Sequence, residues 1–76
     1  MAQATHIHVF YTDRENGWVA TALDNSGNQV GVGVYTYRQS DAISAAKDHK
    51  LPIYVFYRNG LFQRQIKNKP NMEQDK

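Results

Sequence analysis

The segment Ile53–Ile66 reads IYVFYRNGLFQRQI, in which two strand-like runs flank Asn59 and Gly60. An Asn-Gly pair between two such runs is the strongest short-range signal for a β-hairpin, and it favours a two-residue type I′ loop. This loop sets the register of the two strands, so that Phe56 lies opposite Gln63. Because a shift by one residue would exchange the two faces of the hairpin, the turn decides which side chains enter the core.

The predicted register divides the hairpin into two faces. The face richer in aliphatic side chains is assigned to the core, and it holds Ile53, Val55, Tyr57, Phe62 and Ile66, with Arg64 as its one charged member. The opposite face exposes two aromatic rings beside a cation and two amides, a composition typical of binding surfaces. This predicted binding surface consists of Tyr54, Phe56, Arg58, Leu61, Gln63 and Gln65. Alternatively, a dimer partner or the C-terminal tail covers part of it, and the burial of Tyr54 and Phe56 distinguishes the two interpretations.

Three strands are predicted upstream of the hairpin. His6–Thr12 alternates with the period of a strand, and the loop that follows contains Gly17, which can supply a positive φ. Trp18–Leu23 is the second strand. Gln29–Tyr37, rich in β-branched and aromatic residues, is the third.

A helix is predicted between the third strand and the hairpin. Ser40 is a favourable N-cap residue, and Lys47 and Lys50 suit the negative end of the helix dipole. Small side chains dominate its apolar stripe, which consists of Ala42, Ile43, Ala45 and Ala46. Such a stripe lets the helix lie close to the sheet, and we expect it to rest on Gly31 and Gly33 of the third strand.

Together these elements predict an α+β fold. Its order is β-β-β-α-β-β, with an antiparallel sheet of about five strands and one helix packed on one face. Residues 1–67 are expected to form a single domain, and residues 68–76 a flexible C-terminal tail. A chain of 76 residues builds only a small core, which leaves little room for a deep substrate cleft.

Composition and motifs argue against an enzyme. The absence of cysteine removes disulfides, thiolate metal ligands and cysteine nucleophiles. The serines occupy turn or capping positions without an evident base, and paired carboxylates are not evident. His6 and His8 share a strand face, but two imidazoles make an incomplete metal site, and the nearest further candidate, His49, belongs to the helix. No metal, cofactor or small-molecule substrate is therefore predicted.

The chain also lacks the expected signals for export or membrane insertion. Its first residues contain no cationic stretch followed by an apolar run, and no apolar run approaches the ~20 residues that a membrane helix needs. A cytoplasmic protein without membrane association is predicted.

Basic side chains are concentrated in the second half of the chain. Residues 38–72 carry seven Lys or Arg and two Asp, whereas residues 15–37 carry no Lys or Arg. This asymmetry supports nucleic-acid binding as an alternative function, because phosphate contacts dominate the affinity for nucleic acids. The predicted contacts are Arg58, Arg64, Lys67 and Lys69, with Tyr54 and Phe56 stacking on bases.

Several short motifs resemble a family of small bacterial proteins of unknown function, over roughly residues 6–67. The motifs are Gly17-Trp18-Val19-Ala20, the helix Asp41–Lys50 with its Ala45-Ala46-Lys47, then Ile53–Tyr57 and Asn59-Gly60. The chain departs from that family in its tyrosine-rich third strand and its long Asp24–Asn28 turn. The resemblance implies only the fold and a bacterial or phage origin, because the family has no established activity.

A second resemblance is architectural, to the three-stranded DNA-binding domains of plant ethylene-response factors and the arm-binding domains of some integrases. Those domains bind DNA through basic side chains on the sheet, and the charge-poor first three strands here do not supply them.

The sequence therefore predicts a small non-enzymatic protein-interaction module. It would act as a homodimer, or as an accessory or inhibitory factor of bacterial or mobile-element origin, and would bind its protein partner or a second copy through the hairpin. Nucleic-acid binding through the basic, aromatic C-terminal hairpin is the alternative.

Overall fold

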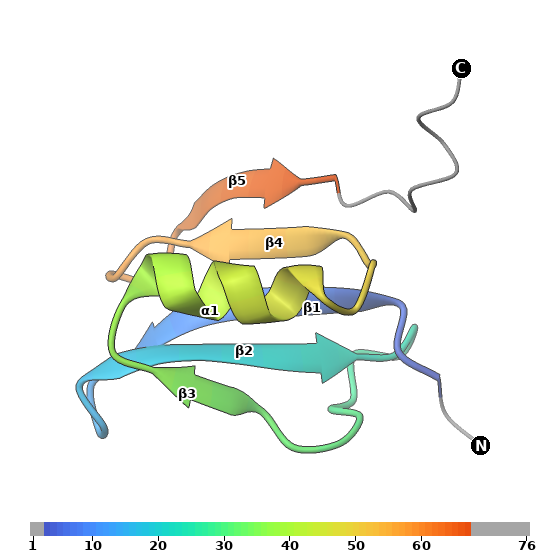
Figure 1. The fold of residues 1–76 in the computed structure, drawn as a ribbon, viewed down its shortest axis with the longest axis horizontal. Helices are drawn as coiled ribbons and strands as arrows, with labels where there is room; N and C mark the ends of the chain where they lie inside the picture. The colour runs from blue at the N-terminus through green and yellow to red at the C-terminus, as the bar shows by residue number, and fades with distance from the viewer. Residues whose placement is uncertain (1–2, 68–76) are drawn as a thin grey trace.

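The computed structural model describes residues 3–67, so the tail predicted at 68–76 lies outside the described residues. Six elements follow one another in the predicted order along the chain (Figure 1). They are β1 (His6–Thr12), β2 (Gly17–Leu23), β3 (Val34–Thr36), α1 (Gln39–Lys47), β4 (Ile53–Phe56) and β5 (Phe62–Ile66). The fold is α+β, with one helix on one face of a five-stranded sheet. No helix in the described part of the chain is long and apolar enough to cross a membrane.

The sheet is mixed, which corrects the prediction of an antiparallel sheet. Its strands lie in the order β3-β2-β1-β4-β5, and β1 pairs with β4 in parallel, while the other three pairs are antiparallel. The parallel pair arises because α1 carries the chain from the β3 edge back across the sheet, and such a crossover returns the next strand in the same direction. The closing hairpin therefore sits beside β1 rather than beside β3, and β1 becomes the central strand.

The core lies between α1 and the central strands. Four β-branched residues of β1 and β4 have at most 1% of their surface exposed, namely Ile7, Val9, Ile53 and Val55. The helix covers them with Ala42, Ile43 and Ala46, all buried. Small helix residues allow this close approach, because an alanine holds the backbone nearer to the sheet than a longer side chain would. The predicted stripe thus faces the sheet, mainly over β2 and β1, with β3 and β4 on either side.

The expected contact of the helix with Gly31 and Gly33 is wrong. A Cβ added at Gly33 would lie 3.0 Å from Thr21 Oγ1. The absence of a side chain at Gly33 therefore lets the backbone pack closely against β2, not against the helix. A Cβ added at Gly31 would meet no atom within 4 Å, and Gly31 has a φ of +79°. This left-handed residue interrupts the predicted third strand. Only Val34–Thr36 forms β3, while Gln29 makes an isolated bridge to Leu23.

The closing hairpin has a three-residue loop instead of the predicted two-residue loop. Tyr57 N donates to the Leu61 carbonyl at 2.7 Å and Gly60 N to the Tyr57 carbonyl at 2.9 Å, with Gly60 at a φ of +95°. This is a type I turn followed by a left-handed glycine. A bulge at Gln63 then compensates for the extra loop residue. As predicted, Tyr54 lies opposite Gln65 and Ile53 opposite Ile66, but Phe56 lies opposite Phe62 rather than Gln63.

The bulge corrects the predicted faces of β5. Phe62 shares the face of Phe56 and is 54% exposed, instead of entering the core. Gln63 turns to the helix side, where its Oε1 accepts a hydrogen bond from Gln39 Nε2 at 3.1 Å. Tyr57, also assigned to the core, is 50% exposed because it lies at the mouth of the loop.

The helix begins before the predicted N-cap residue. Arg38 occupies the N-cap position with an extended backbone, and its side chain makes no capping hydrogen bond. Its carbonyl accepts from the backbone N–H of Ala42 and from the hydroxyl of Thr36. Ser40 instead lies inside the first turn, beside Asp41. The N-cap position is therefore occupied by arginine, whose side chain has no hydrogen-bond acceptor for the free N–H groups of the first turn.

We expect Arg38→Ser to stabilise the protein by about 1 kcal/mol relative to Arg38→Ala, because a serine hydroxyl at the N-cap accepts from a free N–H of the first turn. Urea denaturation of the two variants followed by circular dichroism measures the difference. Alanine is the matched control, since it also removes the guanidinium. Equal midpoints for the two variants would contradict the expectation.

Candidate interaction surface

The sheet face opposite α1 carries a cluster of aromatic rings. Residues of β1 and β4 alternate between the core and this face, so His6, His8, Tyr54 and Phe56 lie on the side away from Ile7 and Val55. The bulge in β5 adds Phe62. We call these five residues the aromatic face. Within residues 3–67, the single helix packs on the other side of the sheet (Figure 1).

The five rings form a connected network. The His8 ring centroid lies 5.1 Å from that of His6, 5.9 Å from that of Tyr54 and 5.0 Å from that of Phe56. Phe62 closes the network, with its centroid 5.9 Å from that of Phe56 and 6.4 Å from that of Tyr54. Most of these contacts are edge-to-face, the arrangement that aromatic quadrupoles favour. The cluster is therefore an ordered surface, whose rings support one another.

This packing determines how far Tyr54 and Phe56 are exposed to solvent. Both side chains are partly buried, although neither belongs to the core cluster. The rings of His6, His8 and Phe62 account for the contacts that cover them. The two residues are thus neither fully open to solvent nor part of a second packed layer among the described residues.

The whole outer face of the sheet is free of formal charge. The strand register places on it His6, His8, Phe10, Thr12, Gly17, Val19, Thr21, Leu23, Tyr35, Tyr54, Phe56, Phe62 and Gln65. None of these is Lys, Arg, Asp or Glu, in a chain where 21% of the residues are charged. An uncharged sheet face rich in aromatic rings resembles the centre of a protein–protein interface, where charged residues are depleted.

Burial also keeps one of the two histidines in its neutral form. Burial among the rings lowers the pKa of His8 below its ordinary value of 6.5, and the neighbouring His6 lowers this pKa further. His6 itself shares a hydrogen bond with the Thr5 hydroxyl, 2.9 Å from its Nδ1. At neutral pH the imidazole of His8 therefore adds a ring, and no charge, to the aromatic face.

We expect the melting temperature to fall as the pH decreases from about 7 to 5. A histidine with a lowered pKa in the folded state binds protons more readily when unfolded, so its contribution to stability is complete above pH 6.5 and is lost as the pH falls toward its folded pKa. Thermal unfolding at several pH values measures this slope. His8→Phe, which keeps a neutral ring, should flatten the slope, whereas His49→Gln should leave it in place. An identical slope in wild type and His8→Phe would contradict this prediction.

The structure separates the residues of the predicted binding surface. Tyr54, Phe56 and Gln65 share the outer face as predicted. Leu61 is 64% exposed but belongs to the loop end, and Gln63 faces the helix. Arg58 lies with Tyr11, to whose hydroxyl it donates a hydrogen bond at 2.9 Å and over whose ring its guanidinium sits at 4.3 Å. Tyr11 is on the helix side of β1, in contact with Trp18.

The predicted nucleic-acid contacts do not converge on the aromatic rings either. Arg58 is held by Tyr11, and Arg64 lies opposite the buried Val55, on the helix side of β5. Lys67 follows the end of β5, and Lys69 lies outside the described residues. Two predicted cations therefore lie apart from the rings expected to stack on bases, whereas a single-strand platform combines the two on one surface.

Sequence reasoning missed three members of the aromatic face. The alternation of β1 already places His6 and His8 opposite Ile7, but the parallel pairing that brings them beside Tyr54 is a tertiary feature. Phe62 was assigned to the core because a bulge at Gln63 has no clear signature in the sequence. Nowhere in residues 3–67 do three or more His, Cys, Asp or Glu side chains gather as a metal site.

Comparison of the chain with protein-family models, with curated proteins and with solved structures gave no match.

Proposed function

We propose that this chain is a small non-enzymatic protein-interaction module that forms a homodimer through its aromatic face. The observation that carries the proposal is the uncharged outer sheet face with its network of five rings. Aromatic side chains contribute most of the binding energy in many interfaces, because they bury a large apolar area with few rotatable bonds. A second copy of the chain supplies the same apolar chemistry in return.

The absence of charge favours a second copy as the occupant. In a twofold dimer the same surface meets itself, so a charged residue near the axis meets a like charge. Here the outer face brings together aromatic rings, aliphatic side chains, hydroxyls and one amide, with His8 neutral at pH 7. A nucleic acid would instead need cations among the rings. The chemistry of this face therefore suits self-association better than phosphate binding.

The size of the face predicts a dimer that dissociates on dilution. Strands of three to seven residues, rising about 3.3 Å per residue and lying about 4.8 Å apart, cover roughly 400 Å² of the sheet in projection. Stable interfaces bury about 800 Å² on each partner. Side chains that project from the sheet add to the area this face can bury, but the total stays below or near the lower limit for a stable interface. We expect a dissociation constant on the order of micromolar.

Sedimentation equilibrium over a concentration series tests the proposal. We expect the apparent mass to rise from the monomer value of 8.7 kDa toward twice that value. Phe62→Asp should hold the protein at the monomer mass, because it places a charge in each half of the interface. Phe62 is 54% exposed, so the monomer should retain its fold, as circular dichroism can verify.

The matched control is Leu61→Asp. Leu61 is adjacent in sequence and is 64% exposed, but it lies in the loop region outside the aromatic face. This variant should dimerise like the wild type. A wild-type protein that remains monomeric up to millimolar concentration would refute the proposal. Equal weakening of dimerisation by Phe62→Asp and Leu61→Asp would also refute it. Binding of labelled oligonucleotides at low salt that Phe56→Ser abolishes would favour nucleic-acid binding instead.

A further inference from the structure

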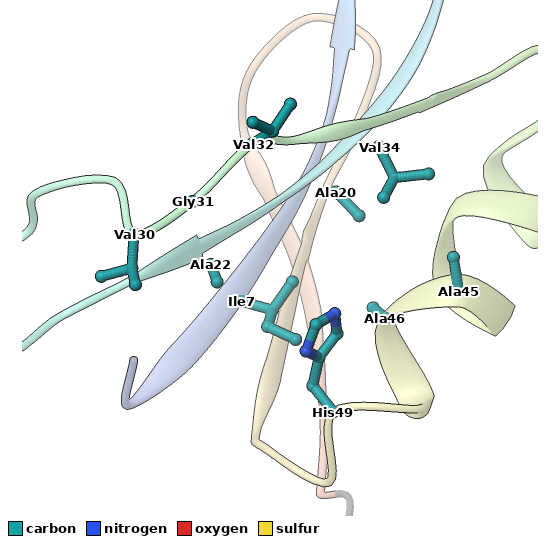
Figure 2. A pocket seen from close by; sticks show the side chains of 10 residues that line it. All are labelled: Ile7, Ala20, Ala22, Val30, Gly31, Val32, Val34, Ala45, Ala46 and His49. Carbon is teal, nitrogen blue, oxygen red and sulfur yellow. The ribbon is translucent and has the colours of Figure 1, made fainter. Parts of the chain in front are cut away.

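A small apolar pocket opens between α1 and the segment that precedes β3 (Figure 2). Its volume is about 190 Å³. The C-terminal half of the helix forms one wall, Val30–Val32 with Val34 form another, and β1 and β2 form the floor. The pocket lies on the helix side of the sheet, so it is distinct from the aromatic face, and the two can be tested independently.

Small side chains explain why this space is not filled. Ala45 and Ala46 of the helix face Ala20 and Ala22 of β2 across the pocket, and none of the four carries an atom beyond Cβ. The left-handed Gly31 carries the chain past this region without contributing a side chain. Protein interiors are usually packed with few voids larger than a water molecule. The helix and sheet here leave a space that their own residues do not occupy.

The lining of the pocket defines the chemistry of a ligand. His49 is the only polar side chain among the ten residues that line it, and the rest are Ile, Val, Ala or Gly. The imidazole projects from the chain just after the helix, toward Ile7 and beside Ala46 (Figure 2). Val32, at the rim, is 93% exposed. A ligand with an apolar body would cover this valine and place one polar group at the imidazole.

We infer that this pocket binds a small neutral molecule consisting of one apolar ring with a hydroxyl group, of the size of phenol. An apolar cavity of about 150 Å³ in another protein takes up benzene, so 190 Å³ accommodates a ring with one substituent. The ring contacts the alanines and valines of the walls. The hydroxyl makes a hydrogen bond with a ring nitrogen of His49, which is the one polar side chain within the lining.

Titration of phenol into ¹⁵N-labelled protein, followed by NMR, tests the inference. We expect saturable shifts of the amides of Gly31, Ala45 and Ala46. Ala45→Leu should abolish saturation, because its side chain fills the space, whereas Ser44→Leu, an exposed neighbour outside the lining, should not. If Ala45→Leu fails to fold, Ala22→Val fills the pocket from the sheet, where a β-branched residue is favourable.

The role of His49 is tested with toluene, which has the same size and no hydroxyl. We expect His49→Leu to weaken phenol binding about three- to tenfold, the usual contribution of one hydrogen bond, and to leave toluene binding unchanged or stronger. The inference is overturned if phenol gives no saturable shifts at tens of millimolar, or if the filled variants bind phenol as the wild type does. Equal weakening of phenol and toluene by His49→Leu would also contradict it.

Discussion

Replacing Ile53 by alanine lowers the free energy of unfolding by about 2–5 kcal/mol, the range for deletion of a fully buried isoleucine side chain. Ile53 has no exposed surface, and it lies between Ile7 of β1 and Ile66 of β5. A chain of this length has a total stability of roughly 4–11 kcal/mol. The substitution therefore removes a large part of the stability of the protein.

Urea denaturation at a fixed protein concentration measures this loss, since dimerisation would make the midpoint depend on concentration. Leu61→Ala is the matched control. It also deletes an aliphatic side chain from the closing hairpin, but Leu61 is 64% exposed and should cost less than about 0.5 kcal/mol. Similar losses for Ile53→Ala and Leu61→Ala would show that the core does not lie between β4 and the helix.

The second large effect is expected at Gly17. A Cβ added there would lie 2.4 Å from a ring carbon of Tyr35 and 2.5 Å from its hydroxyl oxygen. Gly17→Ala therefore displaces the ring and breaks the hydrogen bond that the Tyr35 hydroxyl donates to the Glu15 carbonyl at 2.7 Å. The ring of Tyr35 is 48% exposed and can move aside, so we expect a loss of about 0.5–1.5 kcal/mol in the free energy of unfolding, the net contribution of the broken hydrogen bond.

A double-mutant cycle separates this steric effect from other causes. In a Tyr35→Ala background no ring occupies the space, so Gly17→Ala should cost almost nothing. If the cost of Gly17→Ala is the same in both backgrounds, the ring contact is not its origin. The cycle also tests why glycine occurs here: Asn16, with a φ of +57°, takes the left-handed turn position that the sequence suggested for Gly17.

The aromatic face and the apolar pocket arise from different features of the fold. The aromatic face exists because strand alternation sends the rings of β1 and β4 away from the helix. The pocket exists because the helix that covers the other face is built from alanines near its C-terminal end. A single short helix covers one face with small side chains, and the described part of the chain has no second helix for the opposite face.

The first two strands of the chain were predictable because their signals are local. The strand His6–Thr12 has the predicted bounds, and β2 differs by one residue. Both are regular seven-residue strands whose side chains alternate between the two faces of the sheet with the strand period of two. The third strand was predicted to be too long, because its β-branched and aromatic composition outweighed the two glycines at 31 and 33. There the backbone conformation of a single left-handed glycine decided the outcome.

Local periodicity, turn residues and side-chain size are enough to predict the elements, their order and the alternation of the strand residues. The sequence placed Ile53 and Val55 in the core and Tyr54 and Phe56 on the other side of the hairpin. Which strands become neighbours is a tertiary feature, because it depends on the path of the helix crossover. This path places the histidines of β1 beside the rings of β4, and the bulge at Gln63 adds Phe62 while Arg58 remains with Tyr11. Aromatic and basic residues that alternate in the hairpin sequence therefore lie largely apart in the fold.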